Sequence, residues 1–117
     1  MPRIATFAAV ALAAAVPAAA FAHHGWTSYD EDKTLTVTGK LSDVAWTNPH
    51  GAAHIPYQGR QWAVVLAPIT RMEARGLTAG MINQGQQVTL TGYPRRDGTP
   101  EMRIERIQVG DKTVELR

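Results

Sequence analysis

The sequence predicts a mostly β protein, built as a small barrel of five or six strands with one short helix and preceded by a signal peptide. Three observations support this fold class. The first 22 residues are rich in alanine and almost uncharged. The rest of the chain breaks into short segments in which apolar and polar residues alternate, separated by glycine, proline and aspartate. One stretch, residues 68–76, has the early proline and the exit glycine of a helix.

Residues 1–22 have the three-part layout of a secretory signal peptide. A short basic start precedes a long uncharged run, and Ala20-Phe21-Ala22 gives the small-x-small pattern that signal peptidase requires. The alternative is an uncleaved membrane anchor, because the uncharged run approaches the roughly 20 residues that span a bilayer. Alanine contributes little to insertion and Pro17 breaks the helix. We therefore expect cleavage after Ala22 and a periplasmic location.

Cleavage would leave a single β-barrel domain of 95 residues, residues 23–117. Its formal charge is +1, because one arginine leaves with the signal peptide, so nucleic acid is not an expected partner. The chain has no cysteine, which excludes disulfides, thiolate metal ligands and a lipid anchor. We expect a monomer or small oligomer that is not attached to the membrane after cleavage.

Alternating apolar residues define the expected strands. These strands cover residues 35–46, 53–57, 62–66, 88–92, 102–109 and 114–116. The apolar positions change parity within the first and the fifth of them, which predicts a bulge near Ser42-Asp43 and another between Ile104 and Ile107. Curved strands of this number, with one helix after the third, suggest an OB-like (oligonucleotide/oligosaccharide-binding) barrel. A two-sheet sandwich is the main alternative.

The residues before the first strand form a polar lead-in, in which Trp26 and Tyr29 are the expected anchors onto the body of the domain. Several elements of the mature chain, in this order and spacing, resemble a family of small exported bacterial proteins, mostly proteobacterial, whose function is unknown. The elements are His23-His24, Asp30, Gly39, Trp46-Thr47-Asn48-Pro49-His50, Trp62, Arg75-Gly76, Gly85, Gly92-Tyr93-Pro94 and Asp97-Gly98. The resemblance implies a periplasmic protein and no particular ligand. The family pattern has an acidic residue three places after Trp62, where this chain has Val65.

The four histidines, His23, His24, His50 and His54, are the candidate metal ligands. After cleavage the α-amine and the ring Nδ1 of His23 could chelate one ion, and His24 offers a competing chelate through the intervening amide. An N-terminal amine has a pKa near 7.7–8.0, so it can coordinate a metal at neutral pH. Amine and imidazole ligands without thiolates favour Cu(II) over Ni(II) and Zn(II). His50 projects from a turn and is the expected third ligand.

We therefore expect a non-enzymatic periplasmic binding protein that binds copper through His23, His24 and His50, with His54 as a further candidate ligand. His50 and His54 would be about 13 Å apart along an extended strand, so they share an ion only if the chain folds back. One alternative is an interaction module that binds a protein or glycan through the barrel face, its histidines being incidental. A small copper-dependent oxidoreductase is the third interpretation, and we identify no catalytic residues for it.

Overall fold

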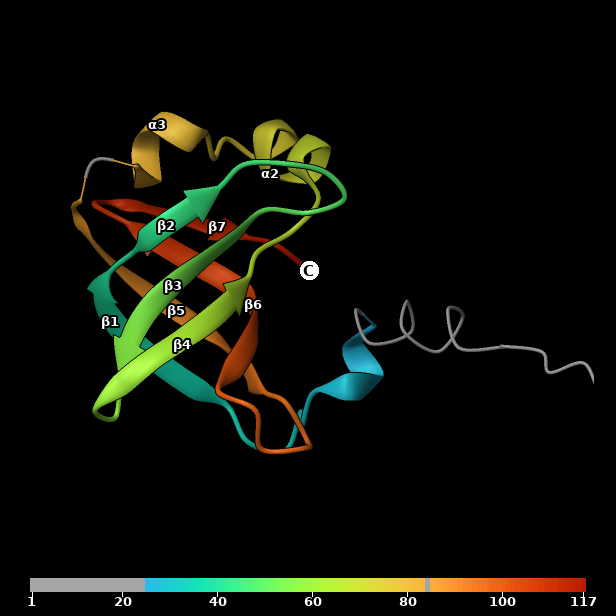
Figure 1. Cartoon of the computed structure of the whole chain (residues 1–117). Coiled ribbons are helices and arrows are strands. Elements are labelled where there is room, and N and C mark those ends of the chain that lie inside the picture. Colours follow the sequence, from blue (N-terminus) through green and yellow to red (C-terminus); the bar gives the residue numbers. More distant parts are fainter. Residues whose placement is uncertain (1–24, 84) are drawn as a thin grey trace, which may run out of the picture.

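The computed structural model describes residues 25–83 and 85–117, shown in Figure 1. The predicted signal peptide, His23 and His24 lie outside these residues. The described elements are η1 (Trp26–Ser28), β1 (Leu35–Lys40), β2 (Ser42–Ala45), β3 (Ala52–Tyr57), β4 (Arg60–Val65), α2 (Ile69–Ala74), α3 (Ala79–Ile82), β5 (Gln87–Pro94), β6 (Glu101–Val109) and β7 (Lys112–Glu115). The mostly β prediction is confirmed. The described residues form seven strands rather than five or six, and two short α-helices rather than one.

All seven strands belong to one sheet, in the order β1-β5-β6-β4-β3-β2, with β7 added to β6. The pairs are antiparallel except for β4 and β6, which are parallel. The sheet is not closed into a barrel, because β1 and β2, at the two ends of this order, do not pair with each other in the described chain. They are consecutive in sequence, separated by Leu41 alone. The chain thus passes from one end of the sheet to the other, as Figure 1 shows.

Both predicted bulges are present, and they explain how the chain changes direction. The β2–β3 register shifts between Ser42 and Ala45, and Asp43 has a positive φ of 50°. The β5–β6 register shifts so that Thr91 pairs with Arg106 while Gly92 pairs with Ile104. An extra residue in one strand strengthens local twist and bends the strand. The first predicted strand is therefore split into β1 and β2, which explains one of the additional strands.

The core lies on the inner face of the curved sheet. Alternate residues of the strands are buried there, as the apolar pattern predicts, and Met72 of α2 and Ile82 of α3 join them. Figure 1 places both helices together at one end of the sheet. The guanidinium of Arg71 donates to the carbonyl of Leu116 at 3.0 Å, and Arg75 donates to the carbonyl of Glu115 at 2.8 Å. Helix α2 therefore holds the C-terminal strand. No helix in the described part of the chain is long and apolar enough to cross a membrane.

Candidate functional site

His54 lies on the outer face of the sheet, in the middle of β3. It pairs in register with Ser42 on one side and Ala63 on the other, and its side chain is 45% exposed. Its ring Nδ1 lies 3.6 Å from Oδ2 of Asp43, the residue that the β2 bulge presents. This separation is longer than a hydrogen bond, and Nδ1 has no hydrogen-bond partner among the described residues. Metal-binding histidines commonly have a carboxylate beside the ring nitrogen that does not bind the ion, and Asp43 lies on that side of His54.

His50 is held in the loop between β2 and β3. The backbone N–H of Gly51 donates to the carbonyl of Ala67, and the carbonyl of Gly51 accepts from the N–H of Leu66, both at 2.9 Å. The Nδ1 of His50 is 3.2 Å from the same Gly51 carbonyl oxygen. A carbonyl can only accept, so Nδ1 carries the proton and Nε2 carries the lone pair. That Nε2 is buried, whereas the ring of His54 is half exposed.

The structure does not bring the candidate ligands among the described residues together in one metal centre. Within residues 25–83 and 85–117, no group of three or more His, Asp or Glu side chains could hold an ion. Strand β3 is extended from Ala52 onward, so the chain does not fold back to bring His50 and His54 together. His23 and His24, which the sequence places first among the ligands, lie outside the described residues.

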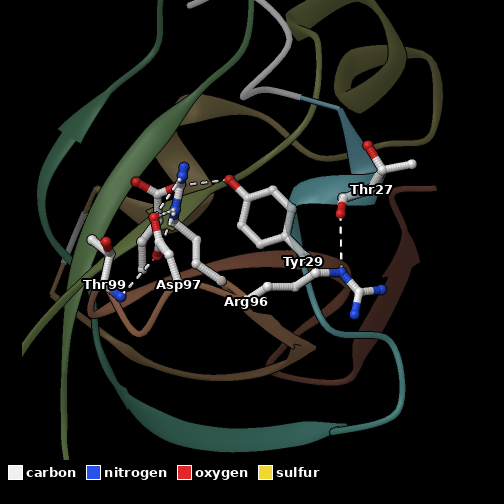
Figure 2. A network of polar contacts seen from close by, with 7 residues as sticks. Thr27, Tyr29, Arg96, Asp97 and Thr99 are labelled. Atoms are coloured by element: carbon white, nitrogen blue, oxygen red, sulfur yellow. Dashed lines mark hydrogen bonds and ion pairs between the residues drawn. The ribbon is translucent and has the colours of Figure 1, made fainter.

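The lead-in is anchored to the hairpin between β5 and β6, as the sequence predicts for Trp26 and Tyr29. The N–H of Asp30 donates to the carbonyl of Pro94 at 2.8 Å. Arg96 donates through its backbone to the carbonyl of Ser28 and through Nε to that of Thr27, both at 3.0 Å. Figure 2 shows the Arg96–Thr27 contact beside the Tyr29 ring. These contacts fix the chain at the point where the described part begins.

Two arginines that are distant from Trp26 in the sequence stack on its ring. The guanidinium carbon of Arg103 on β6 lies 4.4 Å from the centroid of the indole, and that of Arg117 lies 4.2 Å from it. Tyr93 meets the same ring edge-on at 6.2 Å between centroids. Arg117 also pairs with Glu31 at 2.5 Å. Cation–π contacts of this kind each contribute roughly 0.5–1 kcal/mol where the ring is partly exposed. The C-terminal residue thus helps to hold the N-terminal lead-in.

Tyr29 is fully buried, and its hydroxyl donates to Oε2 of Glu101 at 2.5 Å. Arg95 ion-pairs with the same carboxylate at 3.5 Å and with Asp97 at 3.0 Å, and the Asp97 carboxylate accepts from the N–H of Thr99 (Figure 2). Burial, followed by the Glu101 carboxylate, raises the pKa of Tyr29 well above its ordinary value. The hydrogen bond from Arg95 lowers the pKa of Asp97.

Raising the pH above 10 should destabilise the protein through its buried tyrosines. The pKa of Tyr29 and that of Tyr93, whose hydroxyl donates to Glu105, both lie above the ordinary value of 10.0 in the folded protein. The unfolded chain therefore loses these protons first, and the free energy of unfolding falls as the pH rises. Each tyrosine contributes a slope of up to about 1.4 kcal/mol per pH unit.

Urea unfolding between pH 8 and 11 measures this slope. Tyr29→Phe has no phenol to titrate, so its slope above pH 10 should be shallower than that of the wild type. Equal slopes in the two proteins would contradict the assignment.

The anchored lead-in and His54 share the outer face of the sheet. Ala53 and Met102 are buried, so their neighbours Ala52, His54 and Arg103 face outward. Ala52, Val65 and Arg103 are aligned across β3, β4 and β6. Val65, where the family resemblance leads one to expect an acidic residue, thus lies in this outer row. Two strand spacings, about 9.5 Å, separate β6, where Trp26 stacks on Arg103, from β3, which carries His54.

Comparison with protein families places the chain. A family model described as a family of unknown function (DUF6152) matches residues 10–103. The chain belongs to the DUF6152 family. The match includes Trp26, His50, His54 and Arg103, so the family covers nearly all of the outer-face arrangement described above. No curated protein matches this DUF6152 member.

Sequence reasoning identified the histidines and the two anchors, but it missed Asp43 as a partner of His54 and the arginines around Trp26. The change of parity at Ser42-Asp43 could have revealed the position of Asp43, because a bulge directs a side chain out of the regular alternation. No local pattern signals the arginines, since most of the described chain separates Trp26 from Arg103 and Arg117.

Proposed function

We propose that this is an exported periplasmic protein that binds copper, without catalysis, through the amino terminus created when the signal peptide is removed after Ala22. The α-amine and ring of His23 provide the first two ligands, with His24 as the competing chelate. The observation that supports the proposal is the anchoring of Trp26 on the same outer face that presents His54. A new terminus at His23 would begin three residues before that anchor, within about 10 Å of it.

The protein's own residues account for the choice of metal. An amine with a pKa near 8 gives up its proton at neutral pH for about 1 kcal/mol, whereas a lysine would require several times as much. Nitrogen ligands without thiolates favour Cu(II) among the divalent metals. The third ligand is the Nε2 of His50 or of His54. The structure supports His54 through its exposure and its contact with Asp43, and it supports His50 through the fixed position of its loop.

We also propose that the sheet is an OB-like, partly open barrel. The parallel β4–β6 pair, the helices between β4 and β5, and the passage from β1 to β2 at the bulge support this assignment. The OB architecture is a five-stranded, partly open barrel that presents binding surfaces on its outside. In this interpretation β1 and β2 are two halves of one bent strand, and His54 lies on the strand next to the second half.

Titration of the processed protein, starting at His23, with Cu(II) tests the function. We expect one-to-one binding that weakens by at least about tenfold, or 1.4 kcal/mol, when three alanines precede His23. An extension of one or two residues is unsuitable, because it would place a histidine third in the chain and create a new chelate with the amine and two amides. Equal affinity of the processed and extended proteins would overturn the proposal.

The same titration assigns the third ligand. His54→Asn and His50→Asn each remove one imidazole, and the variant that loses affinity identifies the ligand. His54 is the cleaner test, because its side chain is half exposed and its loss should change the free energy of unfolding by less than about 0.5 kcal/mol. If neither variant changes copper binding, the metal is held by the amino terminus alone and the body of the domain has no part in it.

A further inference from the structure

A shallow hollow lies on the outer face of β1, β5 and β6. It has a volume of about 270 Å³, and its lining consists of Thr38, Gln87, Val88, Thr89, Gln108 and Gly110. The strands that form it are at the other end of the strand order from β3, which carries His54. The hollow is therefore separate from the candidate copper site, and it does not depend on the proposed function.

The register of the strands brings the polar side chains of the hollow into one row. Thr38 pairs with Thr89, and Thr89 pairs with Gln108. Their neighbours Val37 and Leu90 are buried, so these three side chains face outward. The hydroxyl oxygens of Thr38 and Thr89 are 3.0 Å apart and share a hydrogen bond. The row is thus a continuous strip of hydroxyl and amide groups across three strands.

The hydrogen-bonding groups of this strip are neutral and of both kinds. A hydroxyl pair uses one of its two hydrogens internally, which leaves one O–H donor and several acceptor lone pairs. Each glutamine amide adds two donors and one acceptor. Among the described residues no charged side chain lines the hollow, and Arg106, which follows in the next outward row, pairs with Glu115 at 2.6 Å. Lys40 lies opposite Gln87 in the register, and Asp111 directly follows Gly110 in the chain, so charged residues of both signs neighbour the lining.

We propose that this hollow binds one residue of a neutral sugar. Every hydroxyl of a neutral sugar is both a donor and an acceptor, which matches the mixed hydroxyl and amide lining. An anionic or cationic ligand would find no side chain of opposite charge in the lining itself. The lining also has no aromatic ring on which a sugar could stack, so binding is weak, with a dissociation constant on the order of 1 mM.

NMR titration of the isotope-labelled protein with maltose, cellobiose and diacetylchitobiose tests the proposal. We expect saturable shifts of the backbone amides of Thr38, Thr89 and Gln108 with at least one of these sugars, and none with digalacturonate, an anionic disaccharide. Absence of saturation with all three neutral sugars up to 50 mM overturns the proposal, as does equal binding of the anionic one.

Matched variants separate the hollow from the rest of the sheet face. Thr89→Val keeps the shape of the side chain and removes its hydroxyl, and it should weaken binding at least fivefold. Thr36→Val makes the same change on β1, two residues before Thr38 and outside the lining, and it should leave the affinity within twofold of wild type. Equal effects of the two variants, or shifts confined to other strands, would show that the sugar does not occupy the hollow.

Discussion

Gly92→Ala should destabilise the protein by about 3 kcal/mol or more, among the largest effects of any single methyl group in the chain. A Cβ at this position would clash with the carbonyl oxygen of Arg103 and would lie 2.7 Å from the Cα of Ile104. Both are backbone atoms of β6, and they cannot move aside as a side chain can. Gly92 sits where the β5–β6 register shifts, so the clash would separate the strands at the bulge that bends the sheet.

Chemical denaturation of Gly92→Ala measures this effect, and two other glycines serve as comparisons. At Gly51 the atom that a Cβ would approach most closely is the terminal methyl of Met72, at 2.9 Å, which can rotate away, so Gly51→Ala should cost less. Nothing lies within 4 Å of a Cβ at Gly80, in α3. Gly80→Ala should therefore stabilise the protein by about 0.5 kcal/mol, because alanine loses less backbone entropy on folding. A change below 1 kcal/mol for Gly92→Ala would contradict the close approach of β5 and β6.

The strands could be predicted from sequence because each one carries its own alternation. The apolar positions of β3 and β5 keep a period of two, and the parity changes at Ser42-Asp43 and between Ile104 and Ile107 mark both bulges. Closure of the sheet could not be predicted in the same way. Whether the two ends of a sheet pair depends on twist and strand order, which accumulate over all the strands and leave no pattern in any one of them.

The candidate site shows the same limit. The type and spacing of the histidines indicate a metal hypothesis, and the bulge at Asp43 is visible in the sequence. The groups that fix the lead-in cannot be recognised in the sequence, because Trp26 meets Arg103 and Arg117 only after the whole domain has folded. The family match does not supply what is missing, since it identifies relatives of unknown function. The site must therefore be tested through its anchors as well as its ligands.

Tyr29→Ala should have an effect on stability as large as that of Gly92→Ala, and it should also weaken copper binding. Tyr29 is fully buried, and replacing a buried aromatic residue by alanine costs about 3–5 kcal/mol. Its backbone also forms an isolated β-bridge with Arg95, which is one of several contacts that join the lead-in to the sheet. Removing the ring takes away the buried side chain of the lead-in, which should weaken the anchoring that would place the new amino terminus near His54.

Tyr29→Phe is the matched control for this prediction. It keeps the ring and removes only the hydroxyl, which leaves Glu101 with Arg95 as a partner at 3.5 Å, so the cost should be nearer 1 kcal/mol. Denaturation at pH 7 gives the two stabilities, and Cu(II) titration at a temperature where both variants are folded gives the two affinities. Because the anchor survives in Tyr29→Phe, its copper affinity should match the wild type while that of Tyr29→Ala falls. If both variants keep the copper affinity of the wild type, the amino terminus binds copper without help from its anchor. The shared outer face would then have no role in the site.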